Sequence, residues 1–384
     1  MNIGIIGLGR VGIPFALLCQ ESGLSVVVSD EDEELIYNLK QNICLTSEPD
    51  IQRMLFEQQG ITTSEPIEII KNSDIIFTFI ETLPSLDGNI DTSVVFEVAN
   101  LFFTASKLDI PLFEKKFVIC TTTNPGDVEQ IQKKIDMFNI QVAYHPIFSE
   151  NGEIVSYLKN SDLILIGTIH QQIFDDIIKI YQKIRGYSIN SFMMDIKSAE
   201  VAKLAISSFV SIKNTFANMV GNLMTNLGIN KDINLVLNAI GGDSRIGIKE
   251  LKYNFGFGGP ILSRDNKALN YILENSNTDI NLISKIDDLN KSHLNFLKEK
   301  YIKLNPDKSL PFVMNGICYK KGTNILESSQ RYQLCLDLLN DGYTINVIED
   351  SVVSTKLNSL SESYEGRLKF FKINTTPEGI LIDL

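Results

Sequence analysis

The sequence is poor in the residues that bind metals, form crosslinks or bind polyanions. Its five cysteines are odd in number and widely spaced, and its three histidines are scattered, so neither forms a metal-ligand cluster and no metal is expected. Isolated thiols suit a reducing compartment, which predicts a cytoplasmic protein. The net charge is −12 and no basic block is present, so nucleic acid and anionic membranes are poor partners.

Long apolar runs are also absent. No run approaches the length of a membrane span. The apolar start of the chain is interrupted by glycines and by Arg10, which favours a first strand of the fold over a signal peptide. At 384 residues the chain is too long for one hydrophobic core and should form two or three domains.

The clearest motif lies between a β-rich run at Asn2–Ile6 and a helical pattern. Gly7, Gly9 and Gly12 form G-x-G-x-x-G there, and a second strand then leads to Asp30. Gly7 permits a tight turn, Gly9 lets the backbone approach a pyrophosphate, and Gly12 lets the helix pack closely on the strand. The pyrophosphate would lie at the helix N-terminus, where unpaired N–H groups favour anions.

This segment, with Arg10 and Val11 inside the motif, is therefore expected to bind a dinucleotide. Asp30 would accept hydrogen bonds from a ribose 2′-hydroxyl, and its carboxylate would repel a 2′-phosphate, so NAD is favoured over NADP. The alternative is a glycine-rich turn without a ligand. The complete strand–helix–strand unit with its terminal acid favours dinucleotide binding.

Strands alternate with helices to about residue 190, which predicts one doubly wound parallel sheet. In such sheets, ligands bind at the carboxyl ends of the strands. Thr82 and Thr122 follow the strands expected at 73–80 and 117–121. Both threonines are therefore expected on the cofactor side.

The alternation then stops. Lys197–Asn226 has helical periodicity over a length that is unusual for a globular helix. More helices are expected at 233–239, 266–274 and 280–300, whereas Tyr253–Asn266 is too glycine-rich for regular structure. From Pro311 the alternation returns, with a strand at 312–315, a helix at 329–340 and a strand at 344–348.

The predicted fold is α/β, with two Rossmann-like doubly wound domains joined by a long central helix and a helical region. We expect an NAD-binding domain at 1–196, a central helical region at 197–305, and a second α/β domain at 306–384. In proteins of this kind the active site usually lies between the domains.

Several motifs in order resemble the nucleotide-sugar dehydrogenases of the UDP-glucose/GDP-mannose dehydrogenase type. They are GLGRVGIP at 7–14, TTTNPGD at 121–127, AEVAKLAISSF at 199–209, GGDSRIG at 241–247 and NGICYKKGT at 315–323. The resemblance covers nearly the whole chain. It implies NAD-dependent oxidation of a nucleotide-linked sugar, a UDP-sugar first of all, by a homodimer built on the long helix. It also implies that 197–305 is the dimerisation and substrate region and that 306–384 is a nucleotide-sugar-binding domain.

The resemblance breaks at three positions. The family oxidises a sugar C6 alcohol to an acid in two hydride transfers, with a cysteine that captures the intermediate aldehyde. Ile261 stands where that cysteine is expected, Ile147 replaces a glutamate implicated in thioester hydrolysis, and Ser207 replaces an asparagine that helps hold the oxyanion. An isoleucine has no lone pair to offer a carbonyl and cannot carry an acyl group.

Other residues of the family pattern are kept. The resemblance implies that Lys203 and Asp265 flank the reacting carbon and that Thr122 helps position a catalytic water. Lys203 could stabilise a developing alkoxide. The backbone at Phe255–Gly259 would wrap the diphosphate, and Arg245 would contact the sugar bound to a partner subunit. The implied substrate-binding residues are Lys203, Lys213, Asn218, Arg245, Phe255, Gly258 and Gly259.

Each of these side chains also has a purely structural alternative. Lys203 could be a solvated charge on a long helix, and Asp265 could cap the next helix. Arg245 could form an intrachain ion pair, and Thr122 could simply end its strand. Glu327 stands at the place of a family arginine, which predicts different nucleotide contacts near the C-terminus.

The losses remove acyl-enzyme formation and breakdown but spare the cofactor motif and the lysine. The first hypothesis is a two-electron, NAD-dependent oxidation of a nucleotide-linked sugar or polyol that stops at the carbonyl. A second is a catalytically silent relative that binds a nucleotide sugar or a partner enzyme. A third is a full four-electron UDP-sugar 6-dehydrogenase that uses another nucleophile.

Overall fold

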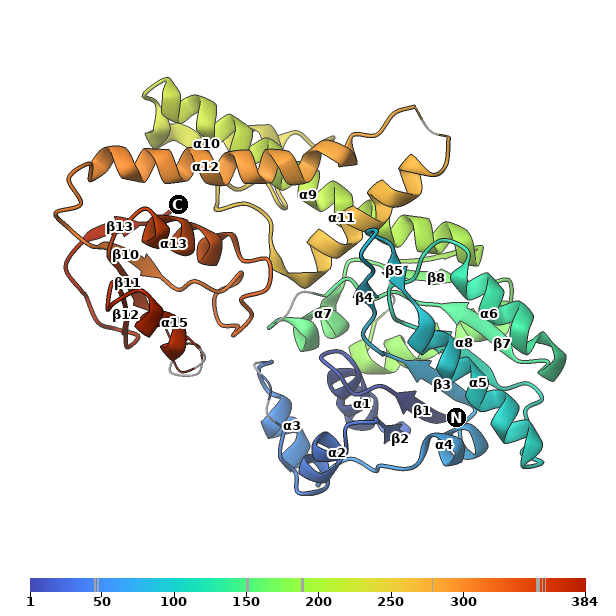
Figure 1. Ribbon diagram of the computed structural model, residues 1–384. Coiled ribbons are helices and arrows are strands. Elements are labelled where there is room, and N and C mark those ends of the chain that lie inside the picture. The colour runs from blue at the N-terminus through green and yellow to red at the C-terminus, as the bar shows by residue number, and fades with distance from the viewer. Residues whose placement is uncertain are drawn as a thin grey trace. The chain divides into compact units, whose positions relative to one another are not determined.

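The computed structural model describes residues 1–44, 46, 48–149, 152–187, 190–277, 279–349, 353, 355 and 357–384. The chain separates into two compact units, Met1–Leu204 and Ala205–Leu384, which are described here one at a time (Figure 1). The expected division into 1–196, 197–305 and 306–384 stays a prediction. Among the described helices, none is both long enough and apolar enough to cross a membrane.

Unit 1 follows the alternation read from the sequence. Its elements are β1 (Asn2–Ile6), α1 (Gly12–Glu21), β2 (Ser25–Ser29), α2 (Glu33–Lys40), α3 (Ile51–Glu57), α4 (Pro66–Asn72), β3 (Ile75–Thr78), β4 (Leu83–Pro84), β5 (Ile90–Asp91), α5 (Ser93–Lys107), β6 (Lys116–Ile119), α6 (Asp127–Ile135), η1 (Asp136–Phe138), β7 (Gln141–Tyr144), α7 (Ile154–Asn160), β8 (Ile164–Gly167), α8 (Gln171–Arg185), β9 (Ser191–Met194) and the start of α9 (Ile196–Asn226). The described strands form a seven-stranded sheet in the order β2-β1-β3-β6-β7-β8-β9 and a short β4-β5 hairpin.

The inner strands of the sheet in unit 1, such as β3, β6 and β8, are buried on both faces, as their continuous apolar runs require, whereas β9 at the edge is partly exposed. Alternate residues of β1 enter two different cores. Ile3 and Ile5 pack with Phe15 of α1 on one face, whereas Ile6 packs with Phe102 of α5 on the other. The helices that pack on the two faces therefore fix the edge of the sheet at which the parallel strands have their carboxyl ends.

The last two strands run against the expected direction. β7 and β8 are antiparallel where Tyr144 faces Gly167, and β9 is parallel to β8. The prediction of a wholly parallel sheet is therefore wrong for β8 and β9. The connecting helix α7 has seven residues and is only about 10 Å long, so the chain turns back without crossing the sheet. As a result, the segment 145–149 stays at the carboxyl edge of β7.

Unit 2 contains the rest of α9, η2 (Asn230–Asp232), α10 (Ile233–Gly242), α11 (Gly259–Glu274), η3 (Ile283–Lys285), α12 (Ile286–Leu304), β10 (Phe312–Asn315), α13 (Gln330–Asn340), β11 (Ile345–Ile348), α15 (Asn358–Ser363), β12 (Leu368–Phe371) and β13 (Ile380–Ile382). Its described strands form a parallel four-stranded sheet in the order β12-β11-β10-β13. Helices α12 and α13 pack together over one face of this sheet (Figure 1).

Helix α11 begins earlier than the sequence suggested. It starts at Gly259, with Pro260 in its first turn, so the expectation of irregular structure up to residue 266 is wrong beyond Gly258. Proline is tolerated in a first helical turn, because the N–H groups there have no intrahelical partner. Ile261 and Asp265 therefore lie on a helix.

Helix α9 has 31 residues, which corresponds to about 46 Å. Its one internal glycine, Gly221, has a packing reason. A Cβ at this position would lie 2.1 Å from the ring of Tyr253. The glycine therefore lets the start of the glycine-rich segment pack directly on α9.

Candidate functional site

The three motif glycines are required for different reasons. Gly7 has a φ of +93°, and a Cβ on Gly12 would lie 2.1 Å from the carbonyl oxygen of Gly7. Both are therefore needed by the fold itself. A Cβ on Gly9, in contrast, would meet nothing within 4 Å, and Gly9 is exposed. The chain leaves open space over Gly9, as expected where a backbone must approach a ligand.

Asp30 closes onto this loop from the end of β2. One of its carboxylate oxygens accepts a hydrogen bond from the backbone N–H of Leu8, and the other accepts one from Asp32 at 3.0 Å. Leu8 lies between Gly7 and Gly9, so the carboxylate is fixed beside the proposed pyrophosphate loop. This is the position in which an acid can accept a ribose hydroxyl.

A cavity of about 1040 Å³ opens at this edge of the sheet. Gly7, Gly9 and Asp30 all line it, together with residues of the loops after β2 and β3. The described lining includes six carboxylates but one lysine, Lys40. The carboxylates are Asp30, Glu31, Glu33, Glu65, Glu81 and Glu97. Their charge would repel a 2′-phosphate, which agrees with a site for NAD.

Arg10, the second variable residue of the motif, lies at the mouth of the glycine loop and pairs with Glu81. Both side chains are largely exposed. Val11 precedes the first residue of α1 and is half-buried. The structure therefore holds the glycine loop to the end of β3 through an ion pair, and contact of Arg10 or Val11 with a cofactor stays a prediction.

Thr82 and Thr122 lie side by side, as the pairing of β3 with β6 requires. The hydroxyl of Thr82 donates to the backbone carbonyl of Thr122 at 2.8 Å, and both residues are buried. Thr121 makes a similar bond to the carbonyl of Ile80. The two loops expected on the cofactor side thus form one connected surface.

Glu200 organises the loop after β6, a role that the sequence reading missed. Its carboxylate is fully buried and accepts hydrogen bonds from the hydroxyl of Thr123 at 2.8 Å, from the N–H of Gly126 at 2.6 Å and from that of Val128 at 3.1 Å. Burial raises the pKa of Glu200 to about 7, against the opposing effect of these donors. The first turn of α9 is thereby fixed to the loop that contains Thr122.

Lys203 follows Glu200 on the same helix face. It is 2% exposed, which excludes the solvated-charge alternative. Its ammonium lies 5.4 Å from the centre of the Phe148 ring. Phe148 directly follows Ile147, the position where the resemblance places a glutamate. An aromatic ring therefore lies beside Lys203, next to the position where the resemblance places a carboxylate.

His145, at the start of the same segment, is structural. Its Nδ1 lies 2.9 Å from the carbonyl oxygen of Leu165, and its Nε2 lies 2.8 Å from the hydroxyl of Tyr181. Burial lowers the pKa of His145 to about 4, so the ring is neutral near pH 7. Both nitrogens are used within the core, which leaves the segment anchored just before Ile147.

In unit 2, two predicted substrate ligands hold the backbone. The side-chain oxygen of Asn218 accepts the N–H of Asn254 at 2.9 Å, at the start of the glycine-rich segment. Lys213 donates to the carbonyls of Ile246 and Gly247 at 3.2 and 3.0 Å. Both residues are seen positioning loops, and direct substrate contact by either stays a prediction.

The glycine-rich segment lies tightly against the loop after β10. A Cβ on Gly258 would lie 2.4 Å from the carbonyl oxygen of Ser328, and one on Gly259 would lie 2.7 Å from the ring of Tyr319. Phe255 is 6% exposed and packs in the core of unit 2. The spacing of glycines here follows from this close approach of two loops.

Asp265 is fully buried in the interior of α11, so the helix-cap alternative is wrong. It pairs with Arg264, a residue that the sequence reading did not single out, at 2.8 Å. Arg245 forms the intrachain pair weighed as its alternative, with Asp243 at 2.7 Å, yet its side chain is 86% exposed. Glu327 is exposed as well.

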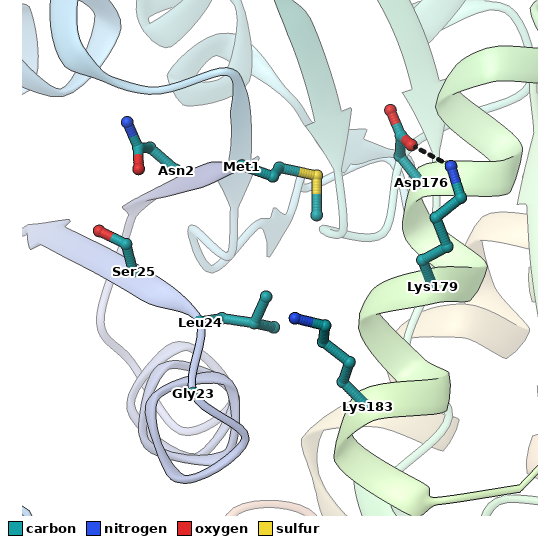
Figure 2. A pocket seen from close by; sticks show the side chains of 8 residues that line it. All are labelled: Met1, Asn2, Gly23, Leu24, Ser25, Asp176, Lys179 and Lys183. Carbon is teal, nitrogen blue, oxygen red and sulfur yellow. Dashed lines mark hydrogen bonds and ion pairs between the residues drawn. The ribbon is translucent and has the colours of Figure 1, made fainter.

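A second cavity, of about 480 Å³, lies away from this chemistry (Figure 2). It is lined by Asn2 and Ser25, which begin β1 and β2, and therefore lies at the amino ends of the strands. Lys179 pairs there with Asp176 on α8, and Lys183 points toward Leu24 (Figure 2). Dinucleotides bind at the opposite edge of such sheets.

The fold and the glycine loop define a dinucleotide-binding α/β protein, and comparison with known proteins names its family. Residues 1–185 match the NAD binding domain of the UDP-glucose/GDP-mannose dehydrogenase family, and residues 197–292 match its central domain. The chain belongs to this family. The resemblance and the fold class predicted from the sequence are thereby confirmed.

Individual relatives agree with this assignment. The chain is 27% identical over 360 residues to the UDP-glucose 6-dehydrogenase of Rickettsia bellii, covering 91% of this chain and 81% of the relative. A UDP-glucose dehydrogenase from Pyrobaculum islandicum has the same fold, with a TM-score of 0.82 at 21% identity over 96% of this chain and 85% of the other. A UDP-D-ManNAc dehydrogenase from Pyrococcus horikoshii matches with a TM-score of 0.75 at 20% identity, and the match covers 99% of this chain and 98% of the other.

The first prediction separates the two kinds of glycine. Gly12→Ala should lower the free energy of unfolding by about 1–3 kcal/mol, because its Cβ would overlap a backbone oxygen. Gly9→Ala should leave stability within about 0.5 kcal/mol of the wild type but weaken NAD binding by roughly tenfold. Denaturation and calorimetric titration measure the two effects. NAD affinity unchanged in Gly9→Ala would contradict the assignment of this loop.

The second prediction concerns pH. Because the pKa of Glu200 is raised in the folded protein, the folded state binds a proton that the unfolded state has lost between about pH 4.5 and pH 7. Stability from this group is present at low pH and is lost as the pH rises through 7. Relative to Glu200→Gln, which does not titrate, the wild type should lose about 2–3 kcal/mol between about pH 5 and pH 8. Urea unfolding of both proteins across this range measures it, and a constant difference would contradict it.

Proposed function

We propose that the protein is an NAD-dependent oxidoreductase that removes two electrons from an alcohol of a nucleotide-linked sugar or polyol and stops at the carbonyl. The first relatives act on UDP-glucose by name, so a UDP-sugar is the first substrate to consider. The observation that carries the proposal is that Lys203 is kept and buried, whereas Ile261 stands at the position where the resemblance places the cysteine. The machinery for the first oxidation is kept, whereas the groups for covalent capture are absent from their expected positions.

Gly7, Gly9, Gly12 and Asp30 would hold NAD, and the open space over Gly9 fits the approach of its pyrophosphate. When bound, NAD would take the carbon-bound hydrogen with its electron pair while the hydroxyl proton leaves to water, which gives one carbonyl, one NADH and one proton per alcohol. Thr82 and Thr122 would shape the surface next to it. Contact of either threonine with NAD is part of the proposal.

Lys203 is the residue that we assign to the developing alkoxide. Its ammonium is buried, so its charge is little screened by water and acts strongly on a nearby oxyanion. Glu200 fixes the position of Lys203 relative to the loop that contains Thr122. Thr122 would position the water that receives the proton. Asp265 is the further acid that the resemblance implies near the reacting carbon, and it pairs with Arg264.

Other nucleophiles are poorly placed to replace the missing cysteine. All five cysteines are buried free thiols. Burial raises the pKa of Cys19, Cys44, Cys120 and Cys335, which keeps them as poorly nucleophilic thiols. These facts weigh against the four-electron alternative.

The third prediction is the stoichiometry of turnover. With a panel of nucleotide sugars, an active substrate should give one NADH per molecule and a product with the mass of the carbonyl or its hydrate. NADH absorbance and mass spectrometry of the product measure both. Ile261→Cys alone should form little acid, whereas the triple change with Ile147→Glu and Ser207→Asn should form more.

Two results would overturn the two-electron proposal. A uronic acid at two NADH per sugar from the unmodified protein would favour a four-electron enzyme with another nucleophile. Binding of nucleotide sugars without any turnover, in protein that also binds NAD, would favour the catalytically silent relative. Lys203→Met in the active protein should abolish turnover while NAD binding is kept.

We further propose a homodimer built on α9. Phe209, Phe216 and Leu223 recur at seven-residue spacing and are 60%, 41% and 58% exposed. This spacing places them on one face of the helix. An exposed apolar stripe of this length marks an interaction surface, and a second copy of the chain covers it in the proposed dimer. Arg245, which is exposed, would then contact sugar bound to the partner subunit.

The fourth prediction tests this stripe. Phe216→Glu combined with Leu223→Glu should convert the protein from dimer to monomer, because two charges would be buried at the interface. Light scattering at micromolar concentration measures the mass. The control is Phe56→Glu, which changes a phenylalanine on α3 that is 75% exposed and should leave the dimer intact. A wild-type monomer would refute the proposal.

A further inference from the structure

Arg331 has an unusual environment for a half-buried cation. It lies in the first turn of α13, and its guanidinium lies over the ring of Phe255 at 4.6 Å from the centre. One of its N–H groups donates to the carbonyl of Asn315 at 2.9 Å. Among the described residues, no carboxylate lies within ion-pair distance. An arginine has five N–H donors, so most of its donors are left for another group.

Three other cations of unit 2 already have partners within the unit. Lys213 donates to two backbone carbonyls, Arg264 pairs with Asp265, and Arg245 pairs with Asp243. The chain as a whole carries a net charge of −12. An anionic ligand at the glycine-rich segment therefore needs local positive charge. Lys320 and Lys321 lie on the loop after β10, and Asp383 and Glu349 act on the charge of Arg331, but Arg331 has its guanidinium held over a ring of the segment itself.

We propose that Arg331 binds the diphosphate of the nucleotide-linked substrate, with Phe255 as the platform that holds its guanidinium plane. A guanidinium presents two parallel N–H groups that match two phosphate oxygens. Stacking on an aromatic ring fixes that plane before the ligand binds, so less conformational entropy is lost on binding. This inference rests on the proposed function for its ligand class.

The structural alternative is that Arg331 merely ties α13 to Phe255 and β10. Arg367 offers a matched control in the same unit. It is also half-buried, lies over the ring of Tyr364 at 5.8 Å and donates to the carbonyl of Leu339 at 2.6 Å. Arg367 thus also stacks on an aromatic ring and donates to a backbone carbonyl, but its ring lies outside the glycine-rich segment.

The fifth prediction compares UDP with uridine by calorimetric titration of the full chain. Arg331→Gln should weaken UDP binding about tenfold or more, since charge-assisted hydrogen bonds are lost, while uridine binding stays within twofold. Arg331→Lys, which keeps the charge but not the paired donors, should give an intermediate loss for UDP. Arg367→Gln should change neither ligand, and NAD binding should be normal in every variant.

Two results would overturn the inference. UDP affinity of Arg331→Gln within twofold of the wild type would exclude a phosphate contact, and equal losses for UDP and uridine would indicate a merely structural role. Wild-type protein that binds neither UDP nor GDP would overturn it together with the proposed substrate class. Two NADH per sugar, with the Arg331 effect intact, would overturn only the two-electron proposal.

Discussion

Three hydrogen bonds to the buried carboxylate of Glu200 join helix α9 to the loop after β6. Burying an ionised carboxylate costs several kcal/mol of folding free energy unless hydrogen-bond donors surround it. Glu200 can therefore be ionised in this position only because the loop supplies such donors. Thr122 lies on that loop, and Lys203 lies one turn along the helix. The relative position of these two proposed active-site residues therefore depends on Glu200, which need not touch substrate, together with the bond from Thr82 to Thr122.

The same part of unit 1 contains one of the positions at which the chain departs from the sequence pattern that it resembles. The resemblance places a glutamate after β7, but here Ile147 is partly buried against the core and the ring of Phe148 lies near Lys203. The lysine is buried, and an aromatic side chain from this segment lies beside it. In unit 2 the missing cysteine is matched by Ile261 on the first turns of α11. Both replacements fit the proposed two-electron reaction, because a site that forms no thioester has no use for a group that hydrolyses one.

Much of the fold could be predicted from the sequence, because the glycine motif and the alternation of strand and helix are local patterns. The direction of β8 could not, since a strand has the same period of two in either direction. The start of α11 was hidden by Gly258 and Gly259, whose presence reflects close contacts with Ser328 and Tyr319. Glu200 and Arg331 were missed because a charged residue on a helix is usually solvated, and only packing shows that it is buried or stacked.

The central claim is that oxidation proceeds without a covalent bond between substrate and protein. Its most direct test is the intact mass of the protein, quenched during turnover with NAD and its nucleotide-sugar substrate, and of its peptides. The account predicts the unmodified mass at every time, and it predicts that the variant Ile261→Cys, Ile147→Glu, Ser207→Asn accumulates a sugar adduct on the peptide containing residue 261. A sugar adduct on the unmodified protein, at any residue, would contradict it.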